Sequence, residues 1–281
     1  MADAPTQVDP EVVRERPSSS PPALVHHGWL EAFPWLVQGT TVRHAEVEAF
    51  DLGLFGEGAS GDAVRANWAR LLEATGMRAA VHARQPHGAV VRVWDDWADA
   101  GGESGKEGAA AGESQLEPPH LQPPCDGHAT DRAGVLLAVT AADCVPVFMV
   151  DPQRRAVAMV HAGWRGAAAG VLEAGLDTMR VAFGTRAPEV HLHLGPSICG
   201  SCYEVGPEVF QALGRPVPRG PEPIDLRAVL GERAVEAGVD GERISVSGHC
   251  TLCTDSGLFS HRGGDAGRQV GYLGVRAGAR R

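Results

Sequence analysis

The sequence is poor in cysteine, has no long apolar run and begins without a signal-like segment. Six cysteines among 281 residues are too few for a disulfide scaffold, so we treat them as candidate ligands or nucleophiles. No segment approaches the roughly 18 consecutive apolar residues of a membrane helix. Residues 1–22 lack the apolar run of a secretory signal, and we predict that they form a disordered leader. We therefore expect a cytoplasmic protein without a membrane partner.

Basic residues are also scarce. Lys and Arg total 25 against 35 Asp and Glu, which gives a formal net charge of −10. Nucleic-acid binders need a basic surface that displaces counterions from phosphates, so we expect no nucleic-acid partner. The apolar content of 43% is ordinary for a globular protein. We expect one catalytic domain over residues 23–281, as a monomer or a small homo-oligomer.

One internal segment interrupts this domain. Residues 95–124 are rich in Gly, Ala, Glu and Pro and contain almost no large apolar side chain after Trp97. Such a segment buries too little surface to offset the entropy lost on ordering. The composition predicts a flexible surface insertion.

Hydrophobic periodicity predicts an α/β or α+β domain with mixed β-sheets flanked by helices. One amphipathic helix is expected over residues 62–75, with Asp62 as its cap and Gly76 as its stop. A helix also follows the HAGWRG segment, and another runs from about Asp225 to Gly238. Short apolar runs typical of buried strands cover residues 135–139, 145–150 and 156–160, and further strands are expected at residues 190–194 and 244–248.

Three of the predicted strands and turns carry a possible metal ligand at their ends: His87, Cys144 and His161. Strand ends allow a rigid scaffold to direct distant side chains to one point. One thiolate and two imidazoles suit zinc, and three protein ligands leave a fourth position for water or substrate. A single histidine at a strand end more often has a structural role than a metal-binding one, so the choice between the two roles depends on the surrounding sequence.

The surrounding sequence resembles a known family. The segments that carry the resemblance are ADCVPVFMVDPQRRAVAMVHAGWRG, LGPSICGSCYEVGPEV and HCTLCTDSGLFSHR. From about Thr40 to Leu273, apart from the insertion, the chain resembles the laccase-domain purine nucleoside phosphorylase (YfiH-like) family, formerly labelled multicopper polyphenol oxidases. Family zinc ligands are the His of Gln-Val-His-Gly, the Cys of Ala-Asp-Cys and the first residue of His-Ala-Gly-Trp-Arg-Gly. The matching residues are His87, Cys144 and His161.

The resemblance implies a fold, an activity and partners. The fold is a compact α/β domain with mixed sheets, of the type shared with CNF-toxin-like cysteine hydrolases. The activity is phosphorolysis of adenosine, inosine, guanosine and methylthioadenosine to free base and ribose-1-phosphate, together with deamination of adenosine. The implied partners are purine nucleosides and phosphate, and the implied cofactor is zinc.

The chain departs from the family pattern at five positions. Asp51 and Phe55 stand where Asn and His belong in the family's Asn-Leu-Gly-Leu-His segment, and Trp68 follows Asn67 where the family has Arg. His261 and Gly263 replace Tyr and the second Arg of Phe-Ser-Tyr-Arg-Arg. The zinc ligands are intact.

Several residues are candidates for the chemistry. A bound zinc lowers the pKa of water from about 16 to roughly 7, and deamination at purine C6 then needs a proton shuttle. Asp143 is the first candidate and Glu204 the second, although Asp143 is equally suited to orienting the adjacent ligand. Cys144 itself counts among the catalytic residues because it is the thiolate at the centre of the site.

Phosphorolysis also requires an anion site. Arg165 follows Trp164 in a glycine-flanked turn at a predicted helix start, where a guanidinium and backbone N–H groups can meet phosphate. Arg262 and Arg43 are further candidates, and Trp164 could stack a base. For each of these arginines a structural salt bridge is the alternative, and for Trp164 the alternative is packing.

Two cysteine and histidine patterns remain. The pairs Cys199/Cys202 and Cys250/Cys253 are separated by a long passage, so buried inert thiols are favoured over a four-cysteine zinc site. A multicopper oxidase needs several His-x-His elements, and the sequence has one, at residues 191–193. The polar face of a strand explains that element better than laccase chemistry does.

Two other functions compete with the purine nucleoside enzyme. In the first, Cys144 is a nucleophile activated by His161, which makes a cysteine-type amide hydrolase that edits peptidoglycan precursors. In the second, the protein is a non-catalytic purine-binding module, which the substitutions at Asp51, Phe55, Trp68 and Gly263 would suit.

Overall fold

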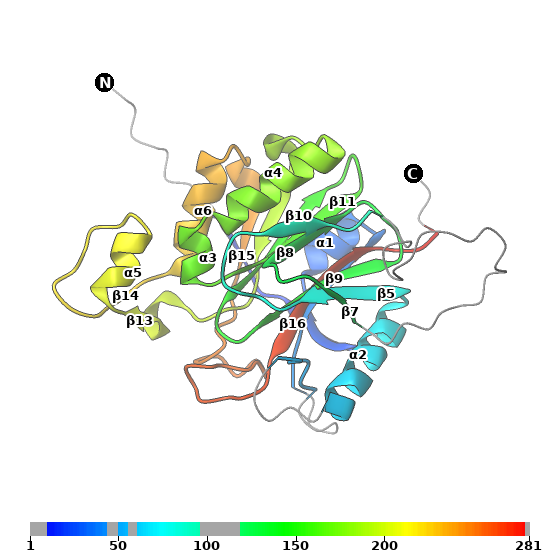
Figure 1. Cartoon of the computed structure of the whole chain (residues 1–281), viewed down its shortest axis with the longest axis horizontal. Helices are drawn as coiled ribbons and strands as arrows, with labels where there is room; N and C mark the ends of the chain where they lie inside the picture. The colour runs from blue at the N-terminus through cyan, green and yellow to red at the C-terminus, as the bar shows by residue number, and fades with distance from the viewer. Residues whose placement is uncertain (1–9, 44–49, 56–60, 96–118, 279–281) are drawn as a thin grey trace.

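Two seven-stranded mixed sheets form the centre of the protein (Figure 1). The computed structural model describes residues 10–43, 50–55, 61–95 and 119–278. The first sheet has the order β1 (Glu11–Val13), β15 (Ile244–Ser247), β12 (His191–Leu194), β10 (Val145–Asp151), β11 (Ala156–Ala162), β8 (Gly127–Thr130), β6 (Val91–Val93). The second has the order β2 (Arg16–Ser19), β3 (Pro22–Val25), β4 (Leu36–Thr41), β16 (Gln269–Val275), β9 (Val135–Ala141), β5 (Ala79–Ala83), β7 (His120–Gln122).

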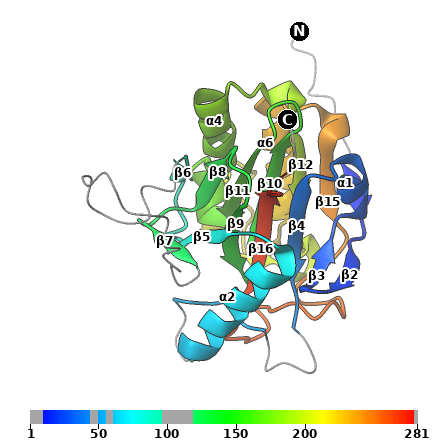
Figure 2. The same cartoon turned by 90° about the vertical axis from the view of Figure 1, so that its right-hand side faces the viewer.

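Helices cover the outer faces of both sheets, so the layers run helix, sheet, sheet, helix (Figure 2). Helices α4 (Val171–Phe183) and α6 (Leu226–Glu236) pack on the first sheet, and α2 (Gly61–Thr75) packs on the second. Shorter helices are α1 (His27–Ala32), α3 (Trp164–Ala168) and α5 (Pro207–Ala212), and β13 (Glu204–Val205) pairs with β14 (Glu222–Pro223). None of the helices described is long and apolar enough to span a membrane.

Strand β10 shows why the central runs are apolar throughout. Val147 and Met149 face the helices, whereas Phe148 and Val150 alternate with them and face the second sheet. Both faces of the strand are therefore buried, and this explains why its apolar residues do not alternate with polar ones. The α/β class with mixed sheets and flanking helices is confirmed.

The predicted strand, helix, strand passage after β10 is also present, with a refinement. Strands β11 and β12 both pair antiparallel with β10, which lies between them. The intervening helix is broken at Gly170, whose φ of 83° lies in the left-handed region. Within HAGWRG, His161 and Ala162 end β11, and Trp164 begins the separate short helix α3 after the cap Gly163.

The residues predicted to cap and end α2 and α6 are confirmed, with the exception of Asp62. Asp225 caps α6 by accepting hydrogen bonds from the N–H groups of Arg227 and Ala228. Gly76, with φ 65°, follows the last residue of α2 as predicted. Asp62 is not the cap of α2, because it lies inside the first turn of a helix that begins at Gly61.

The disordered leader was a wrong prediction for residues 10–22. Strand β1 extends the first sheet beside β15, and β2 pairs with β3 in the second. Backbone pairing at a sheet edge needs no apolar pattern, so composition gave no sign of it. Residues 1–9 lie outside the described residues.

The predicted insertion over residues 95–124 extends too far at its C-terminal end. Residues 96–118 lie outside the described part of the chain. Strand β7, at His120–Gln122, pairs parallel with β5 as an edge strand. Its half-exposed position explains why the sequence there looks polar.

A buried carboxylate anchors the N-terminal strands. Glu15 lies between β1 and β2 and is 5% exposed. Its Oε1 contacts His193 Nε2 at 3.0 Å, and its Oε2 accepts a hydrogen bond from Ser247 Oγ at 2.8 Å. Burial raises the pKa of this carboxyl, but His193 and Ser247 outweigh burial and hold the pKa below its ordinary value.

Glu15→Gln should lower the free energy of unfolding by about 1.5–3 kcal/mol near neutral pH, because a hydrogen-bonded buried charge is lost. The pKa of Glu15 is lower in the folded protein, so its contribution is present above the unfolded pKa. The contribution disappears as the pH falls through the folded pKa, and the difference between variant and wild type should shrink there. Urea denaturation measures both, with exposed Glu11→Gln as the matched control; equal losses in the two variants would contradict this role.

Candidate active site

The three predicted metal ligands come together at one end of the two sheets. His87 follows β5, Cys144 immediately precedes β10, and His161 lies in β11. Antiparallel pairing of β10 with β11 sets Pro146 opposite His161 and so brings Cys144 beside it. One ligand atom from each of the three residues lies within 4.8 Å of the other two. Side chains that are distant in sequence therefore form a single cluster.

Asp126, which the sequence interpretation missed, holds two of these residues in place. Its fully buried carboxylate accepts hydrogen bonds from the backbone N–H of His87 at 2.9 Å and of Gly88 at 2.7 Å. Its Oδ1 also lies 3.2 Å from His161 Nδ1. Because a carboxylate accepts, Nδ1 of His161 carries the proton and Nε2 is left for a ligand bond. The sequence signal was slight: one acidic residue between Cys125 and Gly127.

Asp126→Asn should weaken metal binding by about 10–100-fold, since residues that orient a ligand histidine typically have effects of that size. The amide can no longer accept from all three donors. Competition with a chromogenic chelator measures the affinity. Asp151→Asn is the matched control, because Asp151 is equally buried but bonds Arg154 and Thr185 far along β10; equal affinities for the two variants would contradict the role of Asp126.

Unusual backbone geometry surrounds the cluster. His87 has φ 63° and Asp143 has φ 86°, both in the left-handed region that non-glycine residues rarely adopt. Such conformations persist where the surrounding contacts enforce them, and they concentrate at functional sites. Gly163 meets a steric requirement, because a Cβ there would stand 2.9 Å from Cys144 Sγ and 3.2 Å from His87 Cδ2.

The electrostatics of the cluster favour a thiolate. Burial raises the pKa of the Cys144 thiol, but His161 and His87 outweigh burial and lower it to about 6. Burial in turn lowers the pKa of His161, while Cys144 and Asp126 raise it to about 9. A thiolate is thus stabilised next to two imidazoles. This donor set is chemically able to hold a metal ion.

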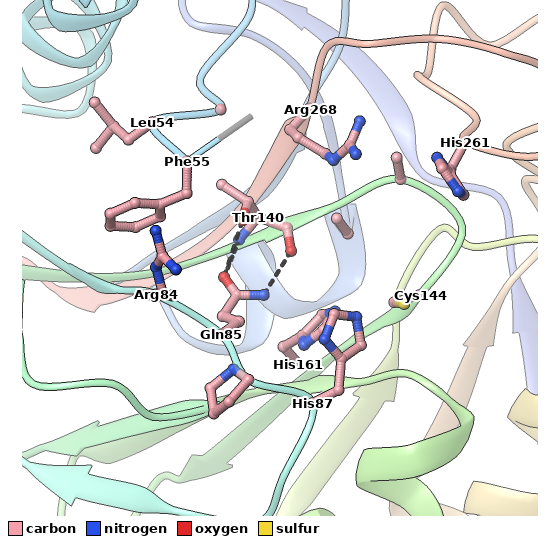
Figure 3. A pocket seen from close by; sticks show the side chains of 14 residues that line it. Leu54, Phe55, Arg84, Gln85, His87, Thr140, Cys144, His161, His261 and Arg268 are labelled. Carbon is pink, nitrogen blue, oxygen red and sulfur yellow. Dashed lines mark hydrogen bonds between the residues drawn. The ribbon is translucent and has the colours of Figure 1, made fainter. Parts of the chain in front are cut away.

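A cavity of about 600 Å³ opens above the cluster (Figure 3). His87, Cys144 and His161 lie on one side of it, and Arg84 and Arg268 lie toward other walls. The remaining lining residues are Gly53, Leu54, Phe55, Gln85, Pro86, Thr140, Ala141, Ala142 and His261. The candidate metal ligands therefore border a space large enough for a small molecule.

Sequence interpretation did not select the two arginines of this cavity. Arg84 lies over the ring of Phe55, 5.5 Å from its centroid. Arg268 donates hydrogen bonds to the carbonyls of Ala266 and Gly267, both at 2.8 Å. The position of Arg84, three residues before His87, was the available signal.

Asp143 connects the cluster of His87, Cys144 and His161 to the loop between β15 and β16. Its Oδ1 accepts a hydrogen bond from Thr251 Oγ1 at 2.6 Å, and its Oδ2 accepts one from the N–H of Arg262 at 2.7 Å. Both oxygens therefore have structural partners. This geometry favours a role in positioning Cys144, the alternative to proton transfer that the sequence left open.

Residues 37–276 match the family described as multi-copper polyphenol oxidoreductase laccase. The chain belongs to this family. A purine nucleoside phosphorylase YlmD of Geobacillus stearothermophilus is 36% identical over 168 residues, which are 55% of this chain and 61% of that protein. The adenosine deaminase RL5, of an unknown prokaryotic organism, is 37% identical over 148 residues, 49% of this chain and 56% of that protein. The chain thus spans less than two thirds of these curated relatives.

Solved structures of similar proteins share the fold. The crystal structure of YlmD from Geobacillus stearothermophilus has a TM-score of 0.74 and 28% identity, covering 87% of this chain and 93% of that one. A Bacillus licheniformis protein, YfiH, also has a TM-score of 0.74, with 25% identity over 90% of this chain and 96% of that one. The resemblance inferred from the motifs is confirmed.

The motif CYEVG contributes Tyr203, which sequence interpretation also missed. Burial and the negative charges of Cys144 and Asp143 raise the pKa of Tyr203 to about 12, although Arg262 and Arg165 oppose them. The guanidinium of Arg262 lies 5.6 Å from the centroid of the Tyr203 ring. Tyr203 therefore lies close enough to Cys144 to feel its charge, and Arg165 and Arg262 are close enough to Tyr203 to lower its pKa.

The other predicted substrate contacts do not line the described part of the cavity. Arg43 pairs with Asp265, and its guanidinium lies over Phe259, which fits the structural alternative. Arg165 lies over the ring of Trp164, 4.2 Å from its centroid. Glu204 is exposed in β13. Roles for these residues in substrate binding remain predictions.

Two departures from the family pattern have structural functions. Asp51 Oδ1 accepts hydrogen bonds from the N–H groups of Gly53 and Arg268. The fully buried Trp68 donates its indole N–H to the carbonyl of Leu52. Both residues support the loop that borders the cavity. Phe55 and His261, in contrast, line the cavity, so they are placed to change what it accepts.

Proposed function

We propose that this protein is a zinc-dependent enzyme that cleaves purine nucleosides with phosphate and deaminates adenosine. The observation that carries the proposal is the cluster of His87, Cys144 and His161 at the border of a cavity of about 600 Å³. Relatives that bear the names purine nucleoside phosphorylase and adenosine deaminase support the substrate class. The substrates would be adenosine, inosine, guanosine and methylthioadenosine, and we place the enzyme in the cytoplasm.

The three ligands would hold the zinc ion with one position left for water or substrate. Zinc in such a site acts as a Lewis acid and makes water more acidic. Asp126 fixes the proton of His161 on Nδ1, and Asp143 fixes the turn that presents Cys144. Arg165 and Arg262 are proposed to bind phosphate on the Tyr203 side.

Arg84 joins them as a proposed anion contact within the cavity, because its guanidinium lines the wall near His87. The apolar ring of Phe55 beside it offers a surface for a purine base. Trp164 is the alternative stacking residue. Glu204 remains the second candidate for proton transfer, since among the described contacts its exposed carboxylate has no bond to the loop between β15 and β16.

Product analysis tests the proposal. Zinc-loaded protein with inosine should release hypoxanthine and ribose-1-phosphate only when phosphate is present, and adenosine should also yield inosine. Chromatography of the reaction mixture separates these products. A folded protein with stoichiometric zinc that forms none of them would contradict the proposal.

A cysteine-type amide hydrolase is the second candidate, and one observation favours it. The lowered pKa of Cys144 beside a buried His161 is also the arrangement of an activated thiol nucleophile. The same sulfur cannot be both a free nucleophile and a zinc ligand. Activity on amides of peptidoglycan precursors in metal-free protein, lost on addition of zinc, would establish the hydrolase.

A further inference from the structure

Four cysteines form a second cluster away from the cavity. Cys199 and Cys202 follow β12, and Cys250 and Cys253 follow β15. Strands β12 and β15 are parallel neighbours, with Leu194 opposite Val246. Their C-terminal ends therefore lie side by side at one end of the sheet, although residues 203–249 separate the two C-x-x-C pairs.

Backbone pairing continues beyond the strand ends into both loops. Ser197 and Cys250 form an isolated parallel bridge, and the N–H of Thr251 donates to the carbonyl of Ser197 at 3.1 Å. The loops are thus held in register before any side chain is considered. The predicted burial is wrong for three of these thiols, because Cys253 is exposed and Cys199 and Cys202 are half-buried, whereas Cys250 is buried.

The four sulfur atoms have the spacing of a tetrahedral metal site. All four lie within 4.8 Å of one another, and Sγ of Cys199 and Sγ of Cys253 are 3.8 Å apart. Four sulfurs bound to zinc at about 2.3 Å lie about 3.8 Å from each other. The cysteines therefore need little adjustment to enclose one ion.

The surrounding hydrogen bonds favour thiolates. Sγ of Cys250 accepts from the N–H of Cys199 at 3.3 Å and from the N–H of Leu252 at 3.4 Å. Hydrogen bonds to a sulfur stabilise its charged form.

We propose that Cys199, Cys202, Cys250 and Cys253 bind a structural zinc ion that joins the loops after β12 and β15. Two C-x-x-C pairs that supply four thiolates complete the coordination sphere, so the site is closed and serves stability. Its position also affects the active site. Thr251, next to Cys250, donates to Asp143, which adjoins Cys144. The second ion would thus brace the wall that presents the catalytic cysteine.

Metal analysis of the full-length protein purified under reducing conditions tests this site. Wild type should contain about two zinc ions per chain, and the variant Cys199→Ser/Cys253→Ser should contain about one. His87→Ala/His161→Ala, which leaves all four cysteines intact, should also retain about one. Leu252→Ala is the matched control: its exposed side chain lies inside the second C-x-x-C pair, and it should retain both ions.

Cobalt substitution identifies the retained ion's ligands. His87→Ala/His161→Ala should show the intense charge-transfer bands of cobalt bound by four thiolates, whereas Cys199→Ser/Cys253→Ser should show only the weaker band of cobalt bound by the single thiolate of Cys144. An equal metal content in wild type and the serine variant would overturn the proposal. So would iron in place of zinc, or a metal-free chain whose mass shows a disulfide between these cysteines.

Metal analysis distinguishes failure of the four-cysteine proposal from failure of the proposed function. If wild type holds a single zinc ion that His161→Ala loses and the serine variant keeps, the four-cysteine site is refuted and the proposed function stands. If the serine variant loses that ion and His161→Ala keeps it, the four-cysteine site is supported and the zinc-dependent activity is refuted.

Discussion

His161→Ala should abolish metal binding at the active site and reduce phosphorolysis and deamination together, by at least about 100-fold. Even residues that only orient a metal ligand typically change affinity or activity by about 10–100-fold, and His161 is proposed to bind the ion itself. The buried imidazole also carries the contact with Asp126, so its loss frees that carboxylate as well. Metal analysis and product formation measured on the same sample test the expectation.

The matched control is His191→Ala. His191 is half-buried in β12 and contacts Phe33 rather than the metal cluster. This variant should keep active-site metal and both activities. If His161→Ala retained full activity while remaining folded, chemistry at this cluster would be excluded. If only one of the two reactions were lost, phosphorolysis and deamination would not share the metal.

Gly163→Ala should weaken metal binding and activity by about 100-fold while the fold is retained, because a displacement of about 1 Å at a reacting group has an effect of that size. The added Cβ would stand 2.9 Å from Cys144 Sγ, and the thiolate must move to accommodate it. Gly163 itself has ordinary extended backbone angles, φ −80° and ψ 173°. The effect should therefore come from crowding alone, without backbone strain.

Gly231→Ala is the control for this substitution. Gly231 lies within α6, and a Cβ there meets Pro10 at an ordinary 3.6 Å. Alanine in a helix stabilises by about 0.4–1 kcal/mol relative to glycine, so activity should be unchanged and stability slightly raised. A fully active Gly163→Ala with unchanged metal affinity would show that Cys144 is not held where the structure places it.

The sequence predicted the cluster of His87, Cys144 and His161 because the motifs that carry these residues are distinctive. HAGWRG and ADC supplied His161 and Cys144, and their strands were recognisable as buried apolar runs. Asp126 was missed because its role depends on three contacts from His87, Gly88 and His161. Such contacts exist only in the folded chain, and no spacing along the sequence encodes them.

The four-cysteine cluster shows a different limit. The long separation between Cys202 and Cys250 argued against a shared metal site, since the two C-x-x-C pairs of a zinc ribbon normally lie close together in the sequence. In this protein the parallel pairing of β12 with β15 brings the two C-x-x-C pairs together, although a long crossover connects the strands. The N-terminal strands illustrate the same limit, because the structural role of Glu15 depends on its contacts with His193 and Ser247, which are distant in the sequence.

Anomalous scattering from crystals at the zinc absorption edge tests the central claim most directly. The account predicts a zinc peak within about 2.0–2.3 Å of one atom each from His87, Cys144 and His161, facing the cavity that Arg84 and Phe55 line. The absence of any peak there in zinc-supplemented crystals, with Cys144 present as a free thiol, would contradict it.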